Sequence, residues 1–268
     1  MKKTTPRIFL IAQTVVNPGS IVAWLEHIGV KDVQGVIRQF ETATNAETLV
    51  AMAGKRCYNS FEVGSNNPNV NSIRTDLDEY ITNILSSGHG SVLEHATWTF
   101  AIEGVSRVFT SEMNRHRAGV AVSEGSGRYI RFSELCFSDI PLKKANEADP
   151  MEETAKMIDE AIASQEKTYV DLCNLWKIDE IKEFKRKKEL TSFFRRIIGQ
   201  GVSTGGIWTI NARALRHIIS MRASAFAEDE IFGVFDQIAT LMSSHEPRLF
   251  GDFEKTGAGT WRARFPKV

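Results

Sequence analysis

Three closely spaced basic residues, Arg115-His116-Arg117, are the strongest candidate for anion chemistry in the chain. The planar guanidinium of arginine can hold a phosphate through two parallel hydrogen bonds, which suits a nucleotide or a pyrophosphate. Two arginines one residue apart diverge on a helix, but they can converge on a ligand at a helix end. The triplet therefore predicts a phosphate site. Taken alone it also fits a solvated basic helix end.

The segment that follows, residues 123–129 (Ser-Glu-Gly-Ser-Gly-Arg-Tyr), combines small hydroxyls, glycines and a further arginine. Backbone N–H groups in such a loop can form an anion-binding nest. Glu124 is close to several arginines in the sequence, so we expect it to orient one of them or to accept a ligand N–H. A ligand-binding loop and a flexible surface turn both remain open for this segment.

Residues 211–222 (Asn-Ala-Arg-Ala-Leu-Arg-His-Ile-Ile-Ser-Met-Arg) form a helical pattern with polar groups on two faces. At 100° per residue, Arg213 and His217 share one face, whereas Arg222 continues the apolar stripe on the opposite face. An arginine on such a stripe is rarely buried without a partner, because desolvation of the charge is costly. We therefore expect Arg222 to meet a ligand, or one of the carboxylates Glu94, Glu124 and Glu230.

Neither histidine nor cysteine spacing indicates a metal centre. His89, Glu94 and His95 lack the spacing of a zinc-protease helix, and no third group of ligands accompanies them, so we predict no metal site. Scattered cysteines without a C-x-x-C pair argue against a disulfide framework, and we expect them to be small buried hydrophobes. These cysteines are Cys57, Cys136 and Cys173.

Composition places the chain among ordinary globular proteins. It has 268 residues, of which 42% are hydrophobic and 25% charged, with 33 Lys+Arg against 33 Asp+Glu. A net charge of zero gives no global field for nucleic acid or an anionic membrane, so we expect neither partner. The basic run at 182–196 is read as a solvated helix face. The apolar run at 8–16 is too short to span a bilayer, and we predict a cytoplasmic protein.

The elements that must position these residues mix strand and helix. We expect strands at 8–16 and 95–102, and a capping box that starts a short helix at Ser91 with Glu94. We expect loops at 59–71 and 118–127, a break at 204–207, and an irregular tail after Pro247. Helical patterns cover 19–28 (helix or turn), 45–54, 74–87, 106–117, 151–189 (one or two helices), 211–224 and 229–243. This mixed order favours an α+β fold over a doubly wound sheet.

Six short segments in sequence order resemble the flavin-dependent thymidylate synthases, the ThyX family. They are Arg56-Cys-Tyr58, residues 88–95 (Gly-His-Gly-Ser-Val-Leu-Glu-His), residues 100–107 (Phe-Ala-Ile-Glu-Gly-Val-Ser-Arg), Arg115-His-Arg117, Ser126-Gly-Arg-Tyr129, and residues 208–213 (Trp-Thr-Ile-Asn-Ala-Arg) followed by Arg222. The Arg-His-Arg triplet with a serine seven or eight residues later is the hallmark of that family. Here eight residues lie between Arg117 and Ser126. The resemblance covers about residues 50–235.

The resemblance implies a single catalytic domain over residues 1–268, with mixed helices around a central, mostly antiparallel sheet. It also implies a homotetramer with its sites at subunit interfaces. FAD would be the cofactor, NADPH the reductant and methylenetetrahydrofolate the one-carbon donor. The residues matched to FAD binding are Ser91, Arg115, His116, Arg117, Glu124, Asn211, Arg213 and His217. Those matched to nucleotide binding are Glu112, Arg115, Ser126, Gly127, Arg128, Arg195 and Arg222.

On this resemblance, Arg222 lies against the pyrimidine edge as the catalytic residue for reductive C5 methylation of dUMP to dTMP. C5 of uracil is a poor nucleophile until electron density moves onto it, and a cation near N3 and O4 stabilises the developing charge. Reduced flavin would supply the hydride.

Three positions depart from the family pattern. Glu112 replaces a usual glutamine, residues 227–231 read Ala-Glu-Asp-Glu-Ile, and Gly199-Gln200 replaces Leu-Pro. A carboxylate at 112 can accept a hydrogen bond from an amino group or a 2′-hydroxyl. This keeps open a related enzyme that methylates or hydroxymethylates a different pyrimidine nucleotide. A non-catalytic protein that binds flavin or nucleotide is the second alternative.

Overall fold

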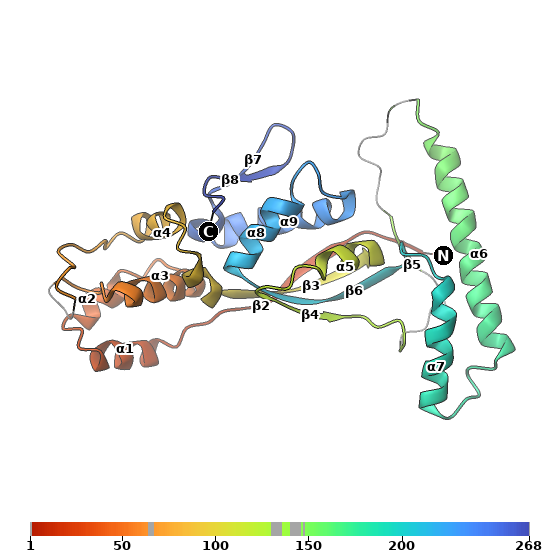
Figure 1. Ribbon diagram of the computed structural model, residues 1–268, viewed down its shortest axis with the longest axis horizontal. Coiled ribbons are helices and arrows are strands. Elements are labelled where there is room, and N and C mark those ends of the chain that lie inside the picture. The colour runs from red at the N-terminus through yellow and green to blue at the C-terminus, as the bar shows by residue number, and fades with distance from the viewer. Residues whose placement is uncertain (1, 64–66, 130–135, 140–145, 147, 268) are drawn as a thin grey trace.

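A four-stranded antiparallel sheet forms the centre of the molecule in the computed structural model, which describes residues 2–63, 67–129, 136–139, 146 and 148–267 (Figure 1). The strand order is β2-β3-β6-β4. These strands are β2 (Arg7–Gln13), β3 (Thr97–Ser106), β6 (Ser203–Asn211) and β4 (Val120–Glu124). The α+β prediction is confirmed at this level, with helix and antiparallel sheet in one chain.

Side-chain alternation explains why β3 lies at the middle of the sheet. Trp98, Phe100 and Ile102 are fully buried, and the residues between them are partly exposed. Phe100 pairs with Trp208 of β6 and with Leu10 of β2 in the strand register, which places all three on the covered face. Burying aromatic side chains of this size is the main contribution to the stability of the core.

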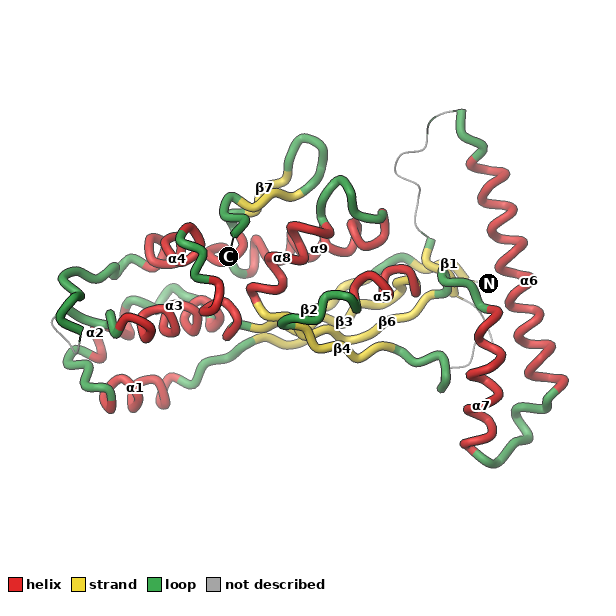
Figure 2. The backbone as a smooth tube through the Cα atoms, viewed as in Figure 1, coloured by secondary structure: helices red, strands yellow, loops and turns green. Residues whose placement is uncertain are grey.

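Three helices cover that face of the sheet, as Figures 1 and 2 show. They are α5 (Arg107–Met113), α8 (Ala212–Arg222) and α9 (Asp229–His245). At one end of the sheet lies a helical group composed of α1 (Pro18–His27), α2 (Val33–Arg38), α3 (Asn45–Tyr58), α4 (Leu77–Ser86) and the short 3-10 helix η1 (Gly90–His95). One continuous hydrophobic core joins these helices to the sheet.

A helical arm projects from the opposite end of the sheet (Figure 1). It is formed by α6 (Met151–Leu175), α7 (Phe184–Phe194) and the short η2 (Arg195–Ile197), with the strand pair β1 (Lys2–Thr4) and β5 (Cys136–Ser138) at its base. The chain ends with α10 (Pro247–Phe250) and the hairpin β7 (Phe253–Lys255) and β8 (Trp261–Ala263). None of the helices in the described ranges is long and apolar enough to span a membrane.

Two predictions about the sheet are wrong. Residues 204–207 do not break the pattern but belong to β6, and much of the predicted loop at 118–127 forms β4. The glycines of β6 allow the two strands to approach. A Cβ on Gly206 would lie 2.6 Å from the Ser123 carbonyl oxygen, so a larger residue could not pair with β4 there.

The other element predictions are mostly confirmed, with shifted ends. The helix predicted over 106–117 ends at Met113, so Arg115–Arg117 lie beyond it. The capping box at Ser91 and Glu94 is wrong: η1 begins at Gly90 and has no side-chain cap. The tail after Pro247 contains the short α10 and a hairpin and is therefore not irregular throughout.

Candidate active site

The Arg-His-Arg triplet lies in a turn between α5 and β4. The turn closes at Gly119, whose positive φ of 70° suits a residue without a Cβ. The backbone N–H of Asn211 donates to the Gly119 carbonyl oxygen at 3.0 Å, so the turn is fixed against the start of α8. The sequence separation of the two segments gives no hint of this contact, which strand pairing between β4 and β6 creates.

The first turns of α8 supply the other side of the same site. The Asn211 side chain caps the helix by accepting from the Ala214 N–H at 2.9 Å. Arg213 and His217 then project from one face, as predicted from their spacing. Together with the triplet they line a cavity of about 610 Å³. Its lining includes Glu94, Arg115, His116, Arg117, Gly119, Asn211, Arg213 and His217.

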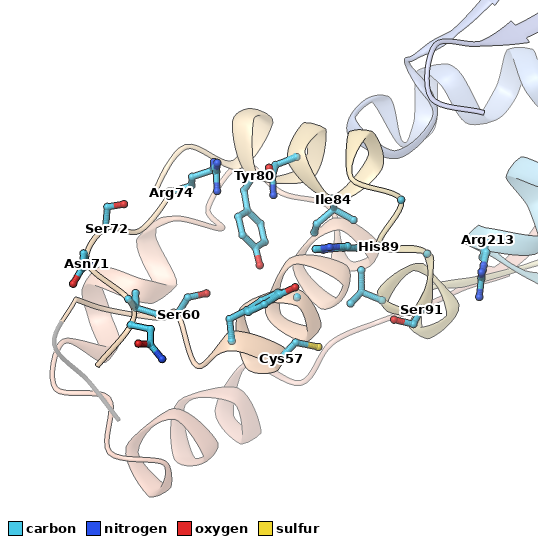
Figure 3. Close-up of a pocket in the computed structure, with 18 residues that line it drawn as sticks. Cys57, Ser60, Asn71, Ser72, Arg74, Tyr80, Ile84, His89, Ser91 and Arg213 are labelled. Carbon is cyan, nitrogen blue, oxygen red and sulfur yellow. The ribbon is translucent and has the colours of Figure 1, made fainter. Parts of the chain in front are cut away.

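A larger cavity of about 810 Å³ lies beside it between α3, α4 and η1 (Figure 3). Arg213 lines both cavities, and Ser91 lies between Arg213 and the rest of the larger one. The rings of Tyr58 and His89 are stacked at its wall with centroids 6.0 Å apart. Cys57 also lines this space and is exposed, so the prediction that the cysteines are buried hydrophobes is wrong for it.

Arg222 is held by two polar partners at the end of α8. Its Nη1 donates to Oε2 of Glu112 at 2.6 Å, and its Nε donates to Nε2 of His116 at 3.0 Å. The expectation that Arg222 meets a carboxylate is correct. Its partner, however, is none of the three glutamates considered. Glu112 is the next-to-last residue of α5, and it comes close to Arg222 because α5 and α8 both pack against α9.

The environment of His116 keeps its ring neutral. Burial, and after it the nearby Arg222, His217 and Arg115, together lower the pKa of His116 from 6.5 to about 4. Because Nε2 accepts from Arg222, the single ring proton of the neutral form is on Nδ1. His116 is therefore a hydrogen-bond acceptor toward Arg222 over the whole neutral pH range.

Glu124 orients an arginine, as one of its two predicted roles required. That arginine is Arg107, which contacts the Glu124 carboxylate through Nη1 and the Gly125 carbonyl oxygen through Nη2. Asn114 donates to the other carboxylate oxygen at 2.9 Å. Glu124 lines a separate cavity with Gly127, outside the two described above.

The remaining sequence-predicted residues lie at the far end of β4. Ser126, Gly127 and Arg128 follow that strand, whereas the triplet precedes it. Arg195 is near this second group, because Thr191 of α7 donates to the Arg128 carbonyl oxygen at 3.1 Å. A five-residue strand spans about 16 Å, so within one chain the predicted nucleotide residues form two separate groups.

Sequence reasoning missed three residues that shape the site. Glu94 lines the smaller cavity and pairs with Arg213 at 2.6 Å, although it was expected to cap a helix or to pair with Arg222. Arg107 fixes Glu124. Arg216 is buried and pairs with Asp252, and its helical spacing from Ala212 and Ile219 on the buried face could have revealed it. In the part of the chain that the structure describes, no group of three or more His, Cys, Asp or Glu residues could hold a metal ion.

Comparison with known proteins identifies relatives over most of the chain. The family described as "Thymidylate synthase complementing protein" matches residues 39–248. A flavin-dependent thymidylate synthase of Mycobacteroides abscessus is 33% identical over 216 residues, which cover 79% of this chain and 81% of that protein. The Corynebacterium diphtheriae enzyme of the same name is 32% identical, with the same coverage. That of Mycobacterium tuberculosis is 30% identical over 222 residues, covering 80% and 82%.

Proposed function

Because the chain belongs to the family of thymidylate synthase complementing proteins, we propose that it is a flavin-dependent thymidylate synthase. It converts dUMP to dTMP by reductive methylation at C5. The observation that carries this assignment is the cavity in which the Arg-His-Arg turn meets the polar face of α8, with Arg222 fixed next to it. Relatives of this name match four-fifths of the chain.

The residues around the two adjoining cavities fit FAD. Arg115, Arg117 and Arg213 supply cationic donors for a pyrophosphate, and Asn211 and His217 add polar groups beside them. Arg213 and Ser91 extend the same set into the larger cavity, whose aromatic wall suits a flat ring. When bound, the flavin supplies the hydride that completes the methyl group. Glu124 lies outside these two cavities and holds Arg107, so its part in FAD binding would be indirect.

Arg222 is the residue we assign to the pyrimidine. Its side chain is 17% exposed and its guanidinium is already oriented, so it can stabilise negative charge on the ring without rearranging. Arg115, Ser126, Gly127, Arg128 and Arg195 complete the nucleotide set, with Arg128 and Arg195 toward the phosphate. Ser126, Gly127 and Arg128 follow β4, and Arg195 is near them, whereas Arg222 lies at the other end of that strand. We therefore assign the complete site to two subunits.

Several finer features belong to the same proposal. The whole chain forms one catalytic domain with the fold of this family and assembles as a homotetramer in the cytoplasm. Methylenetetrahydrofolate donates the one-carbon unit, NADPH reduces the flavin, and neither nucleic acid nor a membrane is a partner. The uncovered face of the sheet supports assembly, because Phe9 and Ile207 lie on it 49% and 44% exposed.

Purified protein tests the proposal directly. Incubated with FAD, NADPH, methylenetetrahydrofolate and dUMP, it should yield dTMP, identified by mass as a nucleotide heavier by one methylene group. Arg222→Ala should lower turnover about 10²- to 10³-fold, because one preorganised charge partner of the reacting ring is lost. FAD absorbance should remain, since Arg222 lines neither cavity. The exposed Arg262→Ala serves as a control and should leave turnover unchanged. Protein that binds no flavin, or an Arg222→Ala variant of normal turnover, would contradict the assignment.

Glu112 favours one alternative strongly enough to test beside it. A carboxylate next to Arg222 can accept from an exocyclic amino group or a 2′-hydroxyl, so a cytosine nucleotide or a ribonucleotide is a candidate substrate. The same assay with dCMP and UMP in place of dUMP distinguishes these cases. Turnover of either in preference to dUMP would establish the alternative.

A further inference from the structure

The larger cavity extends well beyond the residues assigned to FAD. Arg213 and Ser91 line one end of its 810 Å³, and the stacked rings of Tyr58 and His89 lie on its wall. Arg74 lines the end opposite Arg213 (Figure 3). A drug-sized ligand occupies a cavity of about 300–1,000 Å³, so this one has room for a flat ring at one end and an extended group toward Arg74.

The charge at the Arg74 end of the cavity is not neutralised by an acidic neighbour. Among the described residues, those that line the cavity include two arginines and no aspartate or glutamate. Arg213 is paired with Glu94, whereas no carboxylate in the described ranges pairs with the Arg74 guanidinium. An exposed arginine without a counter-charge favours an anionic group at this end of the cavity.

A buried lysine fixes the backbone of Arg74. Nζ of Lys55 donates to the Arg74 carbonyl oxygen at 2.9 Å and lies 4.8 Å from the centre of the Tyr80 ring, and Lys55 is only 2% exposed. Burial lowers the pKa of Lys55 to about 8, so this side chain is still mostly protonated at pH 7. Its charge lies behind the same end of the cavity and adds to the field of Arg74 there.

The lining near this end is polar but mostly uncharged. Amide and hydroxyl side chains predominate, namely those of Ser60, Asn69, Asn71, Ser72, Tyr80 and Asn83. Amides both donate and accept, so this stretch suits a chain with amide and carbonyl groups of its own. NADPH fits less well, because its phosphates need several cations and, of the described lining residues, Arg74 alone is fully charged at this end.

We propose that this end of the cavity binds the p-aminobenzoyl-glutamate tail of the folate, with Arg74 donating to a glutamate carboxylate. This inference rests on the proposed function, which supplies the folate. The pterin ring has to meet the flavin near Arg213, so the tail extends past His89 toward Arg74. It carries one amide and then two carboxylates, which match the uncharged lining and the arginine in that order. Arg74 thus determines folate affinity at a distance from the reacting atoms.

Two folate analogues that differ only in the tail test this by binding alone. FAD-loaded protein is titrated with folic acid and with pteroic acid, which lacks the glutamate, and the change in flavin absorbance reports binding. The native protein should bind folic acid about 3- to 10-fold more tightly. Arg74→Ala should abolish that difference by weakening folic acid and leaving pteroic acid unchanged. The control, Arg262→Ala at an exposed position of β8, should change neither affinity.

The outcomes separate this inference from the function on which it rests. Failure of the native protein to convert dUMP to dTMP would remove the proposed function. Normal conversion, combined with an Arg74→Ala variant that weakens both analogues by the same factor or neither of them, would overturn only the role of Arg74 in binding the tail. Slower flavin reduction by NADPH but not by NADH in that variant, with unchanged folic acid binding, would assign Arg74 to the 2′-phosphate of NADPH instead.

Discussion

At the scale of single residues, His116 couples the electrostatics of the site to protein stability. Its pKa falls from 6.5 to about 4 on folding, because burial and the nearby Arg222, His217 and Arg115 oppose a second proton. Between these two values the unfolded chain carries a proton that the folded chain lacks. The contribution of His116 to the free energy of unfolding is therefore fully present above about pH 6.5 and is lost as the pH falls toward 4.

His116→Asn tests this coupling, because asparagine can still accept from Arg222 but does not titrate. Near pH 5, unfolding of the native protein should take up about one proton more than unfolding of the variant. Urea unfolding at pH 7 and pH 5 measures the difference, and the native protein should lose more stability between the two values. An equal loss in both proteins would mean that His116 titrates normally in the folded state.

The Gly119 turn shows how one residue can control an element. Its φ of 70° disfavours a side chain, and an added Cβ would lie 2.5 Å from the side-chain nitrogen Nδ2 of Asn211. Gly119→Ala should therefore disturb the cap of α8 and destabilise the protein by about 2 kcal/mol, with weaker FAD retention on gel filtration. Gly257→Ala, where a Cβ would contact nothing, is the control and should change neither quantity. Equal behaviour of the two variants would contradict this role of the turn.

The short connection between α10 and β7 fixes α8 from its buried side. Arg216 and Asp252 form a double hydrogen bond at 2.5 and 2.8 Å, with side chains only 2% and 8% exposed. Asp252→Asn should lower the free energy of unfolding by about 3–5 kcal/mol, because it leaves a buried guanidinium without its counter-charge. The matched Asp171→Asn removes an exposed pair with Lys167 and should lower it by at most about 0.5 kcal/mol. Similar losses in urea unfolding would show that burial does not govern this pair.

Local patterns predicted the elements better than they predicted the site. Alternation revealed β3, and helical spacing revealed α8 with Arg213 and His217 on one face, because both patterns are set by neighbours in sequence. The glycines of β6 suggested a break, although their small size is what lets β4 pair with that strand. Glu112 was not expected as the partner of Arg222, since only tertiary packing brings α5 to the end of α8.

At the scale of the whole molecule, the positions of the arginines are the reason for proposing a site shared between subunits. The Arg-His-Arg turn and the start of α8 meet at one end of β4 and β6, whereas Arg128 and Arg195 lie near the other end, at the base of the arm. No described element covers the sheet face that carries Phe9 and Ile207. Packing of a second subunit there could bring the two groups together.

Mixing two inactive variants tests whether one site draws on two chains. Arg195→Ala keeps the Arg222 group intact, and Arg222→Ala keeps Arg195, so each alone should have little activity. If a site takes Arg222 from one subunit and Arg195 from another, random mixed oligomers carry about a quarter of their sites intact, because each residue is present with a chance of about one half. Co-expression with two affinity tags, purification of the mixed species and a dTMP assay should then recover about that fraction of native activity.

Arg222→Ala mixed with Arg115→Ala, both near the same cavity of one chain, should recover nothing. No recovery in the first mixture would place Arg195 and Arg222 in one chain's site, or Arg195 outside the site, and the open sheet face would then need another explanation.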